Sequence, residues 1–295
     1  MSHWLAPAKV NLSLRILGKR SDGFHDLESL MVPLTLVDTL EIERSDAVGV
    51  SLRCSDPEIP CDERNLVVQA ARVFFEATGR SHGGVRVELK KRIPSGAGLG
   101  GGSSDAGAML RAMNALFETG FSVEELADLG ARVGSDVPFF LHEKAAWIRG
   151  RGERVEPLEC TGTVPKLRLL LIKPPFGVPT PWAYRNWRDS QEIPGIPYGV
   201  QYLNWGELVN DLERPVFQKY LLLADLKQWL LKQPEVEGAL MSGSGATVFA
   251  VLREGLAAEA LRERLSSEFG PELWTVFCQT QPNPQLPGAA RGALD

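Results

Sequence analysis

Stretches in which apolar and polar residues alternate recur along the first third of the chain. Residues 9–16 and 85–89 alternate in this way, and residues 38–43 and 48–53 do so over shorter spans. Because successive side chains of a β-strand point to opposite faces, this period of two predicts four strands. The last of them leads directly into a glycine-rich segment.

Helical periodicity appears between and after these strands. Asn65 is placed to cap a helix that runs to about Thr78, where Gly79 supplies a stop. A second helix is expected over residues 104–117. A third begins at Ser122, where Ser122 and Glu125 have the spacing of a capping box. Its end is expected near residue 134.

Strands and helices alternate in the second half. Residues 167–172, which are apolar except for Arg168, predict a strand. Residues 238–252 predict a strand–turn–strand, and residues 274–278 a last strand. Helices are expected over 219–232 and 256–269. The proline-rich stretch 174–197 is either a long ordered binding loop or a poorly ordered excursion. This order predicts an α+β protein.

Length and charge limit the classes of function. With 295 residues the chain can form two domains, which we place at 1–160 and 161–281, followed by a flexible tail at 282–295. A net charge of −5, without a basic block, argues against nucleic-acid binding. No apolar run approaches the roughly 20 residues that span a membrane.

The four cysteines and the N-terminus bear on location. The cysteines show no metal-like or redox spacing, so free thiols in a reducing cytoplasm are expected. The N-terminus lacks the pattern of a signal peptide. An acidic protein can still bind ATP where positive potential is local and Mg²⁺ shields the phosphates.

The strongest chemical signal is a glycine-rich loop that opens into a helix. Five glycines occur in the eleven residues 94–104, Pro-Ser-Gly-Ala-Gly-Leu-Gly-Gly-Gly-Ser-Ser. Glycine allows left-handed backbone angles and a close approach to a ligand. The unpaired N–H groups at a helix N-terminus favour an anion such as phosphate. Ser103 and Ser104 could cap the helix or contact a phosphate oxygen or Mg²⁺.

Three interpretations of this loop compete. A mere flexible turn is disfavoured by the chain entropy that five glycines lose on folding. Residues 96–101 match the G-x-G-x-x-G of dinucleotide-binding proteins, but the preceding strand alternates, whereas a central parallel strand would be continuously apolar. A Walker-type loop fails because no lysine precedes Ser103. A different phosphate-binding loop is therefore favoured.

Several segments together resemble the GHMP superfamily of small-molecule kinases. The similarity is greatest to its branch that acts on a cytidine diphosphate conjugate of methylerythritol in the non-mevalonate route to isoprenoids. The segments are residues 7–12, 20–25, 64–66, 94–104, 134–140, 210–213 and 241–247. Two positions depart from the pattern: Phe24 stands where tyrosine is usual, which leaves a ring without a hydroxyl, and His142 stands where glycine is frequent.

The resemblance implies a two-domain α+β fold, with an N-terminal domain like domain 2 of ribosomal protein S5 and a C-terminal ferredoxin-like sandwich. The cleft between them would hold ATP and the alcohol substrate. The nucleotide is implied to contact Asn65, Pro94, Ser95, Gly96, Ala97, Gly98, Leu99, Gly100, Gly101, Gly102, Ser103 and Ser104. The segment 241–247 is implied to fold against this loop.

The resemblance also implies roles at the reacting hydroxyl. Asp136 would be the base and Lys9 its cationic partner, and a weakly basic aspartate suffices if the proton leaves late in a loose transition state. Phe24, His25 and Tyr184 would hold the cytosine. The remaining implied contacts, to the methylerythritol hydroxyls, are Asn11 and Thr180.

The expected reaction is phosphorylation of the substrate's 2-hydroxyl by ATP, with Mg²⁺ whose protein ligands are unassigned. The expected partner is a small molecule, and the expected state a monomer or homodimer. One alternative is another GHMP kinase, which would have no reason to possess the cytosine-binding set. The other is a nicotinamide-dependent oxidoreductase that uses the glycine-rich loop.

Overall fold

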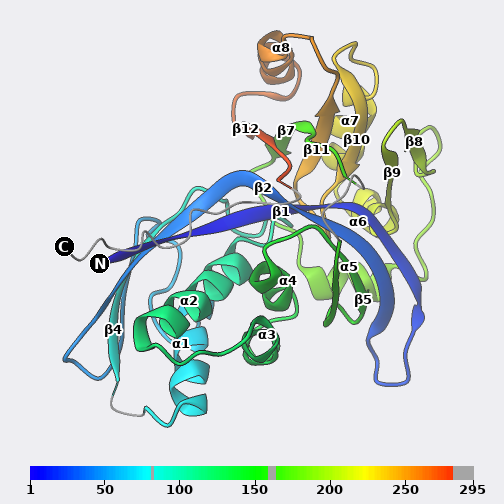
Figure 1. Ribbon diagram of the computed structural model, residues 1–295. Helices are drawn as coiled ribbons and strands as arrows, with labels where there is room; N and C mark the ends of the chain where they lie inside the picture. Colours follow the sequence, from blue (N-terminus) through cyan, green and yellow to red (C-terminus); the bar gives the residue numbers. More distant parts are fainter. Residues whose placement is uncertain (81–82, 159–163, 282–295) are drawn as a thin grey trace.

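Two β-sheets organise the chain (Figure 1), and the computed structural model describes residues 1–80, 83–158 and 164–281. The first sheet has the strand order β3-β4-β2-β1-β9-β8, and β5 also pairs with β2 and with β6. Its strands are β1 (Ser2–Lys19), β2 (His25–Arg44), β3 (Gly49–Cys54), β4 (Gly84–Lys90), β5 (Ala146–Gly150), β6 (Arg154–Pro157), β8 (Gln201–Leu203) and β9 (Gly206–Asn210).

The four strands predicted in the first third are confirmed, but β1 and β2 are much longer than the alternation indicated. The two pair antiparallel along nearly their whole length, with register shifts after Pro7, Asn11 and Ile16. Residues 6–14 of β1 are all buried, including the polar side chains Lys9 and Asn11. Buried polar groups require partners, and those of β1 find them at the candidate site.

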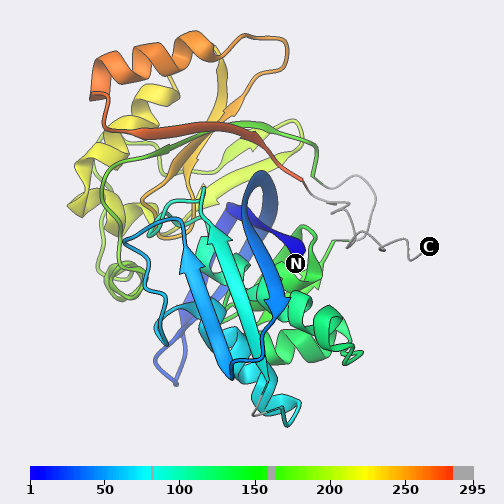
Figure 2. The same cartoon turned by 90° about the vertical axis from the view of Figure 1, so that its left-hand side faces the viewer.

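Helices gather on one side of the first sheet, as Figures 1 and 2 show. They are α1 (Leu66–Ala77), α2 (Gly101–Phe117), α3 (Val123–Ala131) and α4 (Val137–His142). The predicted caps are confirmed: the Asn65 side chain accepts from Val67 N at 2.9 Å, and Ser122 and Glu125 form the capping box. Apolar side chains of α1 and α2 pack on those of β2 and β4 to form a core.

The second sheet lies on the opposite side of the first from these helices (Figure 2). It is antiparallel with the order β10-β11-β7-β12. Its strands are β7 (Arg168–Lys173), β10 (Val236–Met241), β11 (Val248–Leu252) and β12 (Trp274–Gln279), and its helices are α6 (Glu213–Lys219), α7 (Leu221–Leu230) and α8 (Glu259–Phe269). The helix expected over 219–232 thus occupies a shorter range, directly after α6. The proline-rich stretch is ordered and contains helix α5 (Thr180–Asn186).

The two halves are joined through backbone pairing. Strand β9 comes from the second half, yet it pairs in parallel with β1 at Ser13↔Val209 and Leu14↔Asn210. A shared core also spans both sheets, with Val10 and Leu12 of β1 beside Leu169 and Leu171 of β7. The proposed domain boundary at residue 160 and the tail at 282–295 lie outside the described residues. No helix in the described ranges has the length and apolarity that crossing a membrane requires.

Candidate active site

The glycine-rich loop lies between β1 and the turn that follows β10, and it is hydrogen-bonded to both. Lys9 N donates to Leu99 O at 2.9 Å, and Thr247 N donates to Ala97 O at 3.1 Å. Gly98 has φ +72°, and a Cβ there would lie 2.2 Å from Ser242 O. The loop therefore needs glycine at this position both for its backbone angle and for its contact with the 241–247 turn.

The loop ends in the N-terminus of α2, which faces a cavity. Gly100 is the N-cap in a left-handed conformation, and no side chain caps the helix. The helix thus begins at Gly101, three residues before the predicted start, and Ser103 and Ser104 lie in its first turn. First-turn N–H groups without a side-chain cap, together with the helix dipole, form a site for an anion.

Lys9 ties β1 to the loop. Its Nζ donates to Asn11 Oδ1 at 2.6 Å and to Gly98 O at 2.8 Å, and the residue is 3% exposed. Burial lowers the pKa of Lys9, while the negative charge of Asp136 acts in the opposite direction. Asn11 in turn donates to Ser29 Oγ at 2.7 Å. The buried polar face of β1 is thus held in a fixed arrangement.

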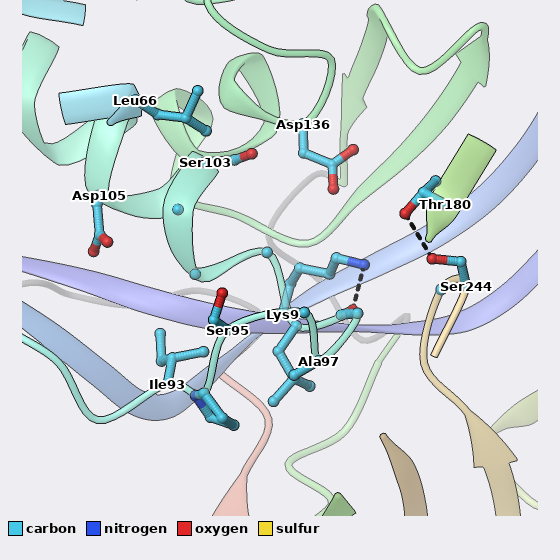
Figure 3. A pocket seen from close by; sticks show the side chains of 18 of the residues that line it. Lys9, Leu66, Ile93, Ser95, Ala97, Ser103, Asp105, Asp136, Thr180 and Ser244 are labelled. Atoms are coloured by element: carbon cyan, nitrogen blue, oxygen red, sulfur yellow. Dashed lines mark hydrogen bonds between the residues drawn. The ribbon is translucent and has the colours of Figure 1, made fainter. Parts of the chain in front are cut away.

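Asp136 approaches the same space from the opposite wall. It is the N-cap residue of α4, but its side chain makes no capping hydrogen bond. Figure 3 shows its carboxylate pointing from α4 toward the space above Lys9 and the glycine-rich loop. Within the described part of the chain, Lys9 and Asp136 form no direct ion pair. They lie on opposite sides of a gap that a small group can enter.

Two adjoining cavities meet at Asp136. The first, about 550 Å³, is lined by the glycine-rich loop, Asn65 and Lys9. The second, about 420 Å³, is lined by Phe24 and His25. The residues that line both are Asn11, Leu14, Met31, Asp136, Thr180 and Tyr184. The Asp136 carboxylate therefore lies at the place where a ligand bound in one cavity would contact a ligand bound in the other.

The second cavity carries the aromatic residues. His25 and Tyr184 have ring centroids 5.7 Å apart with an interplanar angle of 33°. Burial, and then the charge of Lys19, lower the pKa of His25, so its imidazole is neutral at pH 7 and can both donate and accept. Phe24 is 55% exposed, with the Arg151 guanidinium 5.1 Å from its ring centroid. The cavity thus offers flat rings and one neutral hydrogen-bonding group.

Hydrogen bonds from neighbouring segments hold the 241–247 turn in place. Thr180 Oγ1 and Ser244 Oγ lie 2.8 Å apart. Asn210 Nδ2 donates to Met241 O at 2.7 Å and to Gly243 O at 2.8 Å. Glu213 accepts from Met241 N at 2.9 Å and forms a buried ion pair with Lys227. Segment 210–213 therefore supports the turn that closes on the glycine-rich loop.

The structure brings the predicted site residues together with one exception. Ser104 is 1% exposed and lines neither cavity. Sequence reasoning missed Met31, Lys91, Asp105 and Arg151, which do line the cavities. Asp105 directly follows the two serines, so its place in the first helical turn is the signal that could have found it.

Comparison with known proteins decides the family. The models "GHMP kinases N terminal domain" and "GHMP kinases C terminal" match residues 65–144 and 201–272. A 4-diphosphocytidyl-2-C-methyl-D-erythritol kinase of Methylacidiphilum infernorum is 41% identical over 91% of this chain and 93% of its own. The same-named protein of Syntrophotalea carbinolica is 36% identical, over 94% and 98%. The chain belongs to the 4-diphosphocytidyl-2-C-methyl-D-erythritol kinase family.

Solved structures agree with membership in this kinase family. A crystal structure of 4-(cytidine 5'-diphospho)-2C-methyl-D-erythritol kinase has a TM-score of 0.76 at 36% identity and covers 95% of this chain and 99% of that one. A homoserine kinase of Cytophaga hutchinsonii, at 21% identity and a TM-score of 0.65, covers 96% and 95% and shares the fold. The predicted two-part GHMP fold is confirmed. The protein is an ATP-dependent kinase, and the oxidoreductase alternative is excluded.

Proposed function

We propose that the protein phosphorylates the 2-hydroxyl of 4-diphosphocytidyl-2-C-methyl-D-erythritol with ATP. The observation that carries this proposal is the position of Asp136 at the junction of the two cavities. One cavity has a helix N-terminus and a glycine-rich loop for phosphates. The other has aromatic rings for a base. The accepting hydroxyl would lie between them, and relatives of this name that match over most of this chain support that assignment.

The side chains have separate tasks in this scheme. Asp136 accepts the proton of the attacking hydroxyl as the bond to the γ-phosphorus forms. Lys9, held by Asn11 and Gly98, places a positive charge beside the transferring group. Main-chain amides at the start of α2 bind the triphosphate oxygens. Asn11 and Thr180 would contact the polyol, and Phe24, His25 and Tyr184 the cytosine.

Mg²⁺ fits the donor set of the nucleotide cavity. Mg²⁺ prefers oxygen ligands and usually keeps phosphates and water with one or two protein groups. The Ser103 hydroxyl lines this cavity and would hold the ion together with the triphosphate and water. The ion would neutralise charge on the triphosphate. We place the enzyme in the cytoplasm, as a monomer or homodimer.

A coupled ADP-release assay tests the assignment. The cytidine diphosphate conjugate should give ADP with a kcat/KM at least about 100-fold above that for mevalonate or homoserine, because neither control can fill the aromatic cavity. Comparable rates with either control would assign the chain to another GHMP activity.

Replacing His25 by Ala should raise KM for the cytidine substrate by about tenfold and leave KM for ATP within about twofold, because His25 lines the second cavity and does not line the nucleotide cavity. Initial-rate kinetics with each substrate varied in turn measure both constants. His3→Ala is the matched control, since His3 lies at the start of β1 with a side chain that is 66% exposed. Equal increases in both KM values would contradict a cytosine contact.

A further inference from the structure

Arg111 is a largely buried arginine on α2 that has no task in the scheme above. Its side chain is 12% exposed. Each of its guanidinium nitrogens has a partner of its own: Nη1 donates to Phe140 O at 2.5 Å, Nη2 donates to Leu5 O at 3.1 Å, and Nε lies 3.2 Å from Glu143 Oε1. A buried cation is costly unless such partners compensate its lost hydration. The guanidinium therefore ties together the segments that supply those partners.

The partners of Arg111 belong to the two elements that carry the proposed reacting side chains. Leu5 lies on β1, four residues before Lys9. Phe140 lies in the last turn of α4, and the N-cap of that helix is Asp136. Carbonyl groups in the last turn of a helix have no partner within the helix, and a cation there also interacts favourably with the helix dipole. One side chain of α2 thus connects β1 with α4.

Helix α4 is short and packs closely on its neighbours α2 and α3 (Figure 1). A Cβ on Gly107 of α2 would lie 3.1 Å from Phe140 Cβ, and a Cβ on Gly130 of α3 would lie 2.9 Å from Val137 Cγ1. These contacts bring the helices near one another. Apolar contacts have no direction, however, and a hydrogen bond does. The bonds from Arg111 are therefore what fixes α4 along its own axis.

The Phe140 ring relates the position of α4 to the glycine-rich loop. A Cβ on Gly100, the N-cap of α2, would lie 2.7 Å from Phe140 Cζ and 3.1 Å from Lys9 Cγ. Phe140 is 2% exposed, so its ring is held on all sides by close packing. The residue whose carbonyl Arg111 binds therefore also sets the spacing between α4 and the lysine that faces Asp136.

We propose that Arg111 is a positioning residue for phosphoryl transfer, which holds α4 where the Asp136 carboxylate reaches the accepting hydroxyl. It acts through Asp136 and touches no substrate, since it lines neither of the two cavities that the described residues form around the reacting groups. A displacement of about 1 Å in a reacting group can cost about 100-fold in rate. This inference rests on the role proposed above for Asp136.

The variant Arg111→Met tests the proposal, because methionine keeps part of the apolar stem and removes every donor. Its kcat should fall by about 10- to 100-fold. Its Kd for ATP, measured by calorimetry without the alcohol substrate, should stay within about twofold, because an interaction lost only in the transition state lowers kcat alone. Arg111→Lys keeps the charge but not the planar fork, and should recover part of kcat.

Arg44→Met is the matched control. Arg44 is exposed, and its Nε donates to Leu116 O at 3.1 Å, so it too binds a backbone carbonyl of the last part of a helix, here α2. It touches neither β1 nor α4 through a hydrogen bond or ion pair among the described residues. Its replacement should leave both kcat and the Kd for ATP within about twofold of wild type.

A double variant separates positioning from a general loss of structure. Adding Arg111→Met to Asp136→Asn should lower kcat by less than about twofold more, because the carboxylate that Arg111 positions is already gone. A further loss as large as in the wild-type background would overturn the proposal, as would a wild-type kcat in Arg111→Met. A similar loss of ATP affinity and of kcat would show a structural role instead.

Two arrangements keep this test decisive. If Arg111→Met does not fold, Arg111→Lys enters the same double-variant comparison, and additive losses there would equally overturn the proposal. Wild-type protein is assayed first with the cytidine substrate. If that substrate gives no ADP, the proposed function fails alone, and the Arg111 variants are compared on the alcohol that does give ADP.

Discussion

Asp136→Asn should lower kcat by about 10²- to 10⁴-fold. Asparagine matches the shape of aspartate but cannot accept the proton of the attacking hydroxyl at neutral pH. The fold should be retained, because the Asp136 side chain makes no capping hydrogen bond to α4. Lys9 also keeps its two hydrogen bonds, to Asn11 and Gly98. The substitution should therefore lower kcat and leave the affinity for ATP unchanged.

Steady-state kinetics and a thermal melt together check this result. The unfolding midpoint of Asp136→Asn should stay within about 2 °C of wild type, which corresponds to a stability change below about 1 kcal/mol in a chain of this size. Asp128→Asn, on the exposed side of α3, is the matched substitution and should keep full activity. A kcat near the wild-type value would remove Asp136 from the role of base.

Gly98→Ala should reduce both stability and ATP affinity. The new Cβ would lie 2.2 Å from Ser242 O and 2.9 Å from Gly245 O, both backbone atoms that cannot turn aside. Overpacking costs about 1–3 kcal/mol, and a left-handed angle costs a non-glycine residue a further 1–2 kcal/mol, roughly. The loop must move away from the 241–247 turn, so its amides no longer converge on the triphosphate.

The variant Gly120→Ala separates the cost of the left-handed backbone angle from the cost of the close contact with the 241–247 turn. Gly120 has φ +70°, close to the +72° of Gly98, but no atom lies within 4 Å of a Cβ placed there. Its substitution should show only the cost of the backbone angle and leave ATP binding unchanged. Chemical denaturation and nucleotide titration measure both quantities. If the two variants lost equal stability and bound ATP equally well, close packing of the loop on the turn would not matter.

Local signals in the sequence predicted the start of a helix well where a single side chain caps that helix. Asn65 and Ser122 cap their helices as expected, because a side-chain oxygen and a backbone N–H two or three residues away are sufficient. The full length of β1 was not predicted. Residues 6–14 of this strand are buried on both faces, so the alternation of buried and exposed positions that marks a strand is missing there. Helix α5 was also missed, since prolines at its start, though compatible with a first turn, dominate the local composition.

In the candidate site too, features that depend on local sequence were predicted, and features that depend on contacts between distant segments were not. The glycine-rich loop is visible in the sequence because its composition is unusual. Lys91 escaped notice among three consecutive basic residues, because only the fold places it between Asp38 and Asp105. Ser104 was assigned to the nucleotide, yet it is buried and does not line the cavity, because α2 begins at Gly101 and places Ser104 in its first turn.

The late strand β9 has a consequence for how the protein is made. Ribosomal synthesis delivers the glycine-rich loop more than a hundred residues before Asn210, which pairs with Leu14 and holds the 241–247 turn. Until that segment emerges, the nascent chain carries an uncovered edge on β1, open to pairing with other chains. A polypeptide interrupted by premature termination near its middle would thus be prone to aggregate and unable to bind its nucleotide.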